Sequence, residues 1–165
     1  MNSLEDLLGV KVYVYYLVFN DEVLAYSWHF NKNKALYNLA KITKYHNLEG
    51  KIVFEKFNGS LVNEIEKVVL KGEKFSLPSF DYKNKKVYMN ILDIPRGETR
   101  SYSEIAAKSS IRYIELLVML LRNPFQVLIP CHRLLTKKGK LMGFYPLGKE
   151  VKMRLLSLEG VKLLG

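Results

Sequence analysis

The hydrophobic pattern of this chain changes once, at residues 71–84 (KGEKFSLPSFDYKN), and this change limits the folds open to it. Before that segment, stretches rich in aromatic and β-branched residues alternate with stretches of helical spacing, whereas helical patterns predominate after it. Gly72 and Pro78 interrupt the periodicity between the two parts. We therefore predict an α+β protein with two domains, residues 1–76 and residues 77–165.

The amino-terminal domain is expected to be a small α/β unit with an antiparallel sheet. Its first two stretches are separated by the turn-prone pair Asn20-Asp21 and consist largely of β-forming residues, which predicts a hairpin. Including a third stretch of alternating residues, the predicted strands are 11–19, 22–30 and 51–57. The predicted helices are 33–45 and 60–70, and Ser60 is a candidate N-cap for the second.

The carboxy-terminal domain is expected to be helical, with helical patterns at residues 85–94, 101–108 and 111–122. Ser101 stands three residues before Glu104, which is the spacing of a capping box, and Ser110 is a candidate cap for the last helix. A short turn would join the last two helices. This pattern is typical of a helix-turn-helix that binds DNA, although an αα-hairpin without a DNA role has the same pattern and is commoner.

Nearly all of the excess positive charge lies in the second domain. The chain has a formal net charge of +10; residues 77–165 carry 16 Lys and Arg against 7 Asp and Glu, whereas residues 1–76 carry 10 against 9. A solvated lysine-rich surface explains this charge. A polyanionic partner explains it too, because lysine and arginine that neutralise phosphates release condensed counterions. Charge alone favours nucleic acid only slightly.

Several classes of protein are excluded by what the composition lacks. No apolar run reaches the roughly 18 residues of a transmembrane helix, and the amino terminus has no signal-peptide pattern, so no membrane association is expected. A single cysteine cannot form an internal disulfide, which favours a reducing, cytoplasmic location. His29, His46 and His132 fall in no zinc-ligand spacing, and we expect neither a metal nor another cofactor.

The only cysteine, Cys131, lies in the sequence LIPCHRLL and has two readings. A free cysteine is most often a small buried apolar residue. A reactive cysteine needs a neighbouring base, cation or helix amino end that lowers its pKa, and His132 and Arg133 are residues of those types. Residues 125–129 look like an extended segment leading to Cys131, and neighbouring side chains of an extended chain point to opposite sides. A water molecule would then have to connect the thiol with His132.

The order of motifs around this cysteine resembles the O6-alkylguanine-DNA alkyltransferases over about residues 80 to 160. The elements that recur are the two-helix pattern, Asn123-Pro124, IPCHR and then GFYPLGKEVKMRLLSLEG. The resemblance implies DNA repair on double-stranded DNA that bears O6-alkylguanine. The alkyl group would be transferred irreversibly to Cys131 after base flipping, so that each molecule, acting as a monomer without a cofactor, reacts once.

The resemblance also implies catalytic roles. His132 would be a general base acting through a water molecule, and Glu159 would orient His132 and stabilise its charged form. Tyr102 would help to protonate the leaving guanine at N3. Asn123 would be a hinge that ties the second helix of the motif to the cysteine loop.

The substrate pocket implied by the resemblance involves backbone groups as well as a lid. The carbonyl groups of Cys131 and Leu134 would accept hydrogen bonds from the exocyclic amine of guanine. The lid over the base would consist of Tyr145, Pro146, Leu147 and Gly148.

The second helix of the motif would lie in the minor groove, where one residue takes the place of the flipped base. The family uses an arginine there, and counting back from Asn123 places that position at Ile114. We favour the nearest arginine, Arg112, with a shortened turn, although Ile114 could act as an apolar wedge. The other expected DNA contacts are Ser101, Tyr102 and Arg122.

Several residues depart from the family pattern. Pro146 stands where many relatives have a serine whose N–H donates to O6, so either the Leu147 amide serves or that contact is lost. Gln126 stands where relatives often have a proline that lines the alkyl pocket. The second helix is bulkier than is typical, which would require Leu116, Leu117 or Leu120 to face the core.

Alternatives remain for two residues and for the whole protein. Trp28 is expected in the core rather than as a base-stacking platform, and Lys152 is expected either to position the lid or contact the active-site loop, or to lie in solvent. For the whole protein, the alternative is a non-catalytic helix-turn-helix regulator in which Cys131 is a packing residue. A cysteine hydrolase is poorly supported, because no part of the sequence indicates an acyl-binding site.

Overall fold

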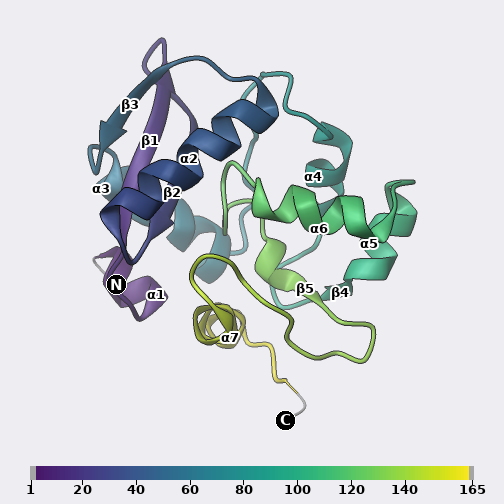
Figure 1. Ribbon diagram of the computed structural model, residues 1–165. Helices are drawn as coiled ribbons and strands as arrows, with labels where there is room; N and C mark the ends of the chain where they lie inside the picture. Colours follow the sequence, from purple (N-terminus) through teal and green to yellow (C-terminus); the bar gives the residue numbers. More distant parts are fainter. Residues whose placement is uncertain (1–2, 164–165) are drawn as a thin grey trace.

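The computed structural model describes residues 3–163, and it has the α+β architecture expected from the sequence (Figure 1). A three-stranded sheet with its helices occupies one side of the molecule, and a mostly helical part with the carboxy-terminal half of the chain occupies the other. Within residues 3–163, no helix combines the length and the apolar character that crossing a membrane requires.

The predicted hairpin is confirmed. Strand β1 (Tyr13–Phe19) pairs antiparallel with β2 (Glu22–His29), and Asn20 and Asp21 take the positive φ values of 49° and 61° that a tight turn of this kind needs. Strand β3 (Lys51–Phe54) pairs antiparallel with the other edge of β1, giving the order β2-β1-β3. The third strand is shorter than predicted and ends before Glu55, whose φ is 56°.

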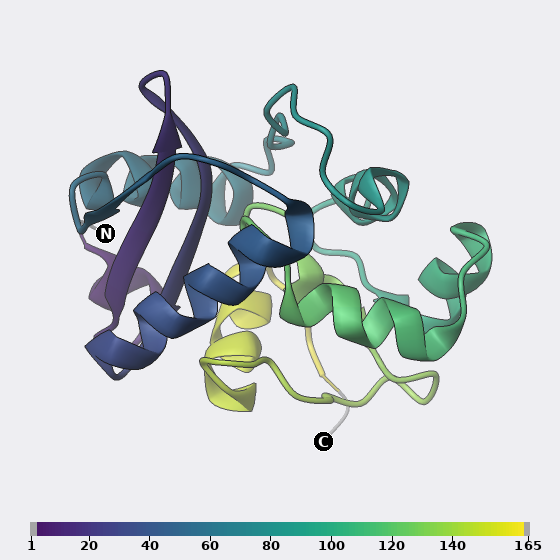
Figure 2. The same ribbon diagram turned by 45° about the horizontal axis from the view of Figure 1, so that its top comes forward.

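Helices cover both faces of this sheet. Helix α2 (Lys32–His46) crosses one face, and α3 (Asn58–Ile65) lies on the other, as Figures 1 and 2 show. A π-helical turn, Glu66–Leu70, continues α3. The prediction that Ser60 caps this helix is wrong, because α3 begins two residues earlier and Ser60 lies within it.

A short helix that the sequence analysis did not predict opens the described chain. Helix α1 (Leu4–Leu8) is capped by the Ser3 side chain, and Gly9 closes it in the left-handed conformation with φ 78°. Arg154 Nε donates to the Leu7 carbonyl oxygen over 3.0 Å, which ties this helix to the far end of the chain.

In the described part of the carboxy-terminal half there are four α-helices and a two-stranded parallel ladder. They are α4 (Lys85–Leu92), β4 (Arg100–Ser101), α5 (Tyr102–Lys108), α6 (Tyr113–Leu121), β5 (Leu134–Leu135) and α7 (Lys149–Leu158). The β4–β5 ladder pairs Arg100 with Leu134 and Ser101 with Leu135. It therefore holds the start of α5 beside the loop that carries Cys131.

The capping box of α5 is confirmed, whereas the expected cap of α6 is wrong. Ser101 Oγ accepts from the Glu104 N–H over 3.0 Å, and Glu104 Oε1 accepts from the Ser101 N–H over 3.1 Å. Ser110 has φ 56° and lies inside the turn, so it cannot take the extended backbone of an N-cap. Arg112 occupies the cap position of α6 without a side-chain capping bond.

The two halves share one hydrophobic core, and polar contacts reinforce it. The Tyr26 N–H on β2 donates to the Pro124 carbonyl oxygen over 3.0 Å. His46, at the end of α2, has Nε2 2.8 Å from the carbonyl oxygen of Arg122. The described segment 71–84, which connects the halves, contains neither helix nor strand.

His46 should make the stability of the fold depend on pH. Burial lowers its pKa below the ordinary 6.5, so the neutral ring donates from Nε2 to Arg122 and accepts the Lys83 N–H at Nδ1 over 3.1 Å. Because the folded pKa is depressed, this stabilisation is complete above about pH 6.5 and is lost as the pH falls through the folded value. We expect urea unfolding at pH 7 and pH 5 to show a smaller loss of stability in His46→Gln than in wild type. An equal loss in both proteins would assign the dependence to other groups.

Candidate functional site

Cys131 lies in a compact loop. It opens a single 3-10 turn, Cys131–Arg133, is 5% exposed and borders a cavity of about 210 Å³. The expected extended segment before it is wrong: residues 125–129 fold as turns, with the Ile129 N–H bonded to the Phe125 carbonyl oxygen at 2.8 Å and Val127 at φ 81°. We call this space the cysteine cavity; its lining residues are Tyr102, Leu117, Leu120, Leu121, Gln126, Cys131, Met142, Gly143, Phe144 and Tyr145.

Asn123 closes this loop with its side chain. Its Oδ1 accepts from the Phe125 N–H over 2.9 Å, and its Nδ2 donates to the Ile129 carbonyl oxygen over 3.2 Å. The same Nδ2 lies 3.5 Å from Cys131 Sγ. One buried amide thus holds both ends of the turn and contacts the sulfur directly.

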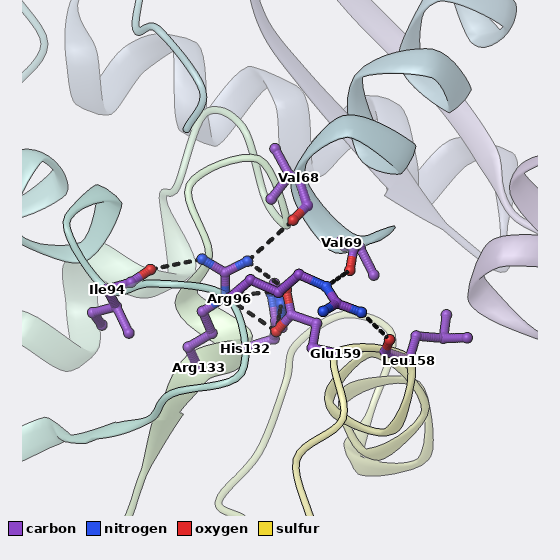
Figure 3. A network of polar contacts seen from close by, with 8 residues as sticks. All are labelled: Val68, Val69, Ile94, Arg96, His132, Arg133, Leu158 and Glu159. Carbon is purple, nitrogen blue, oxygen red and sulfur yellow. Dashed lines mark hydrogen bonds and ion pairs between the residues drawn. The ribbon is translucent and has the colours of Figure 1, made fainter. Parts of the chain in front are cut away.

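Next to the cysteine in the sequence, His132 forms a buried pair with Glu159 (Figure 3). His132 Nε2 lies 3.0 Å from Glu159 Oε1, with both side chains fully buried. Burial lowers the pKa of His132 despite the nearby carboxylate, so the ring is neutral and donates from Nε2. Burial acts to raise the pKa of Glu159, but the hydrogen bonds from His132 and Arg133 and the charge of Arg133 outweigh it and keep that pKa low.

The other ring nitrogen of His132 is the unusual atom of this pair. Nδ1 is buried and, within the described residues, has no hydrogen-bond partner. Because Nε2 carries the proton, Nδ1 presents a free lone pair. This nitrogen is therefore placed to accept a proton from a group or a water molecule beside it.

Arg133 supports Glu159 rather than the thiol. Its Nε donates to both carboxylate oxygens, over 3.0 and 3.1 Å, and its Nη2 also contacts Oε2. The remaining donors reach the carbonyl oxygens of Ile94, over 2.7 Å, and Val68, over 3.3 Å (Figure 3). The expectation that Arg133 could lower the pKa of the neighbouring cysteine is not met, because its charge is directed to Glu159.

The thiol itself is in its neutral form. Burial raises the pKa of Cys131, although the Asn123 hydrogen bond and the charge of Lys152 act in the opposite direction. A thiolate would thus form only when a base removes the proton. The cysteine is buried like a packing residue, but it borders a cavity, and the adjacent residue His132 has a ring nitrogen without a hydrogen-bond partner in the described chain.

Tyr102 and Lys152 form a second buried pair, of which Tyr102 borders the same cavity. Lys152 is 1% exposed, and its Nζ donates to the Tyr102 hydroxyl over 2.7 Å. Burial lowers the pKa of Lys152 to about 8 and raises that of Tyr102. The solvated reading of Lys152 is wrong. Its spacing along α7 indicates the burial, because Lys152 stands three, four and seven residues before Leu155, Leu156 and Glu159.

Only part of the predicted lid borders the cysteine cavity. Tyr145 does, and its side chain is 52% exposed. Pro146 faces a small adjoining space, Leu147 is buried, and the Gly148 N–H donates to the Phe144 carbonyl oxygen over 2.7 Å. The segment along the cavity is residues 142–145.

The two carbonyl groups that were predicted to accept from the guanine amine, those of Cys131 and Leu134, lie in different surroundings. The Cys131 carbonyl oxygen already accepts the Leu134 N–H, which closes the 3-10 turn. Leu134 itself is buried in β5 and is not part of the cavity lining.

Helix α6 has one buried face and one exposed apolar face. Leu116 and Met119 are buried, whereas Leu117 and Leu120 are half-buried and line the cysteine cavity, so the bulky residues are accommodated. The exposed apolar side chains are Tyr113, Ile114, Val118 and Leu121.

The candidate DNA-contacting side chains differ in their exposure and in the contacts that already engage them. Ile114 is 58% exposed. Arg112 is exposed too, but its Nε is bonded to Glu115 Oε1 at 2.7 Å. Ser101 is buried with its hydroxyl in the capping box, and Arg122 is half-buried.

The described residues contain no group of three His, Cys, Asp or Glu side chains that could hold a metal ion. Trp28 is buried as expected, but its indole N–H also donates to Gln126 Oε1 over 2.6 Å. This link between the two halves of the chain was not foreseen.

Comparison with known proteins shows which proteins the chain is similar to. A family model described as "6-O-methylguanine DNA methyltransferase, DNA binding domain" matches residues 83–161. A methylated-DNA–protein-cysteine methyltransferase of Methanothermobacter thermautotrophicus is 44% identical over 75 residues, which are 46% of this chain and 42% of that protein. One of Methanosarcina acetivorans is 40% identical over 94 residues, 51% of this chain and 60% of that protein. The chain thus spans about half the length of these relatives.

The fold recurs over a larger part of the chain. The crystal structure of an O6-methylguanine-DNA methyltransferase from Pyrococcus kodakaraensis superposes with a TM-score of 0.65 and 21% identity, covering 88% of this chain and 90% of that one. At this identity the likeness concerns the fold, including the sheet-bearing amino-terminal part.

Proposed function

Because this chain belongs, through residues 83–161, to the 6-O-methylguanine DNA methyltransferase family, we propose that it repairs DNA by taking an alkyl group from O6 of guanine onto Cys131. The observation that carries the proposal is the cysteine cavity itself. It places a buried thiol beside a space of about 210 Å³, and the next residue along the chain, His132, has an Nδ1 that is free to accept a proton. An in-line displacement by a thiolate needs these parts: a nucleophile, a base and room for the alkyl group.

The protons and electron pairs of the transfer can be accounted for with the residues of the site. A water molecule passes the thiol proton to His132 Nδ1, and Glu159 stabilises the imidazolium that forms. The thiolate attacks the alkyl carbon, the new S–C bond forms, and the C–O6 bond breaks with its electron pair moving onto the guanine. The thioether is stable, so one molecule repairs one base and does not turn over.

The leaving guanine needs a proton, and the Tyr102–Lys152 pair supports a supply at N3. Tyr102 borders the cysteine cavity and receives a hydrogen bond from Lys152. With a pKa of about 8, Lys152 is a stronger acid than an ordinary lysine and can replace a proton that Tyr102 gives up. We assign Tyr102 as the donor and Lys152 as the residue that positions and recharges it.

Double-stranded DNA that carries O6-alkylguanine is the substrate of this proposal. Helices α5 and α6 with their short turn would hold the minor groove, and the base would be flipped into the cysteine cavity beneath Tyr145. The positive charge of residues 77–165 supports phosphate contacts. We extend the proposal to a monomer that acts without a cofactor in the cytoplasm, where a lone cysteine stays reduced.

The division into domains at residues 76 and 77 is part of the same proposal. The sheet and its helices would form a brace for the site-bearing half, supported by the Tyr26–Pro124 and His46–Arg122 contacts. The connecting segment 71–84, without helix or strand, supports the position of the boundary.

Intact-protein mass spectrometry of the wild-type chain tests the proposed function. After incubation with a duplex that contains O6-methylguanine, the protein should gain a single methyl group, about 14 Da, and peptide mapping should place it on Cys131. Binding of the duplex by reduced, unmodified protein without any gain of mass would contradict the proposal and favour a non-catalytic DNA-binding regulator.

Ile114, rather than Arg112, should replace the flipped base in the duplex. Ile114 is 58% exposed and apolar, so no polar contact holds it, whereas Arg112 is engaged with Glu115 although 77% of its side chain is exposed. An apolar wedge offsets part of the unstacking cost, so Ile114→Ala should slow methyl transfer from a duplex by about tenfold and leave transfer from a single strand nearly unchanged. Arg112→Ala is the matched control, and a larger duplex-specific loss in that variant would reverse the assignment.

A further inference from the structure

Gln126 is a buried polar side chain on the wall of the cysteine cavity, and the reaction described above makes no use of it. It is 8% exposed and borders the same space as Tyr102, Cys131 and Tyr145. Its own carbonyl oxygen accepts from the Tyr26 hydroxyl, so the residue is anchored at the backbone as well.

Two hydrogen bonds fix the orientation of the Gln126 amide. Trp28 Nε1 donates to Oε1 over 2.6 Å, and Nε2 donates to the Tyr145 carbonyl oxygen over 2.8 Å. An indole N–H can only donate and a carbonyl oxygen can only accept, so a reversed amide would oppose donor to donor and acceptor to acceptor. The NH2 group is therefore held on the side of Tyr145, an exposed residue that borders the cavity.

This arrangement leaves one donor unused. The NH2 group has two hydrogens; within residues 3–163, the Tyr145 carbonyl takes one and no acceptor meets the other. A buried donor without a partner costs free energy, which a ligand oxygen in the cavity would remove. The hydroxyl of Tyr102, on the same cavity, already receives the Lys152 ammonium.

We propose that the second Nε2 hydrogen of Gln126 donates to the O6 atom of the flipped guanine, and that Trp28 is the positioning residue for this contact. This inference rests on the proposed function. As the C–O6 bond breaks, negative charge grows on O6 and the ring, so a donor held at O6 binds the transition state more tightly than the ground state. The amide keeps both of its hydrogens throughout, and the proton balance of the transfer is unchanged.

The contact gives the amino-terminal half a part in the chemistry. Trp28 lies in β2, and the Trp28–Gln126–Tyr145 chain runs from that sheet to the segment along the cavity. Pro146, which lacks an N–H, cannot supply a backbone donor from its own position. The side-chain amide of Gln126 can supply this donor instead.

The test compares two substrates that differ in one atom: duplexes with O6-methylguanine and with 6-(methylthio)guanine, whose sulfur is a weak acceptor. Gln126→Met keeps the side-chain length without the donor. It should slow methyl transfer from the oxygen substrate by about 10- to 100-fold and leave the sulfur substrate within about twofold of wild type. Trp28→Phe should change the ratio of the two rates in the same direction by a smaller factor. Ser27→Ala, also buried in β2, is the control that should leave the ratio unchanged.

The possible outcomes separate this inference from the proposed function. Transfer by wild type with equal losses on both substrates in Gln126→Met would show a purely structural role and overturn the inference alone. No transfer by wild type from either substrate would overturn both. If Gln126→Met does not give a cooperative thermal transition, Gln126→Glu, which has the same shape with an acceptor in place of the donor, provides the same comparison.

Discussion

A Cys131→Ser variant should take up no methyl group from a duplex containing O6-methylguanine, and His132→Gln should react at least about a hundredfold more slowly than wild type. A serine hydroxyl is a far weaker nucleophile towards an alkyl carbon than a thiolate. In His132→Gln, the side-chain amide can still donate to Glu159, but it has no basic nitrogen where Nδ1 was. The rate of mass gain under single-turnover conditions measures both effects.

The His132→Gln variant isolates the base from the structural contact. Its thermal stability should stay close to that of wild type if the amide keeps the hydrogen bond to Glu159, so a slow rate would report the missing base. A wild-type rate in this variant would mean that another group removes the thiol proton.

The same base predicts how wild-type transfer depends on pH. His132 must be neutral to accept the proton, and burial lowers its pKa below the ordinary 6.5. The rate should therefore hold as the pH is lowered to about 6.5 and fall only as the pH passes through the depressed pKa of the buried ring. A rate that already declines between pH 8 and pH 7 would contradict a neutral His132.

The sequence was most informative where neighbouring residues decide the structure. The Asn20-Asp21 hairpin and the Ser101–Glu104 capping box depend on residues within a few positions of each other, and both are present. The Cys131, His132 and Glu159 set came from a family resemblance, because Glu159 stands 27 positions after His132 and spacing alone does not bring them together.

The parts that could not be predicted depend on partners far away in the sequence. The spacing along α7 indicates that Lys152 is buried, but it does not reveal the hydrogen-bond partner, Tyr102, 50 residues earlier. The loop before Cys131 looked extended because its residues are apolar, but the Asn123 amide folds it into turns. Ser110 looked like a helix cap by residue type, and its left-handed backbone prevents that. In these last two cases a specific contact or dihedral angle overrode the local pattern.

Replacing Arg133 with methionine should lower the free energy of unfolding by about 3–5 kcal/mol. The arginine is buried against Glu159 and the carbonyl oxygens of Ile94 and Val68, as Figure 3 shows. Methionine has a similar length, but it would leave a buried carboxylate with only His132 as a partner and two carbonyl groups without Arg133. Urea unfolding at pH 7 measures the loss.

Arg96→Met is the matched control, because Arg96 lies beside this network and also donates to two carbonyl oxygens, those of Val69 and Leu158. It is exposed and touches no carboxylate in the described chain, so its replacement should cost about 1 kcal/mol or less. If the charge of Glu159 is what makes the loss of Arg133 severe, adding Glu159→Gln to Arg133→Met should recover part of the stability, since a neutral amide is easier to bury. Fully additive losses would show instead that Arg133 stabilises the fold through its carbonyl contacts. The result bears on the reaction, because the arginine that keeps Glu159 ionised also maintains the charge that His132 requires when it takes the thiol proton.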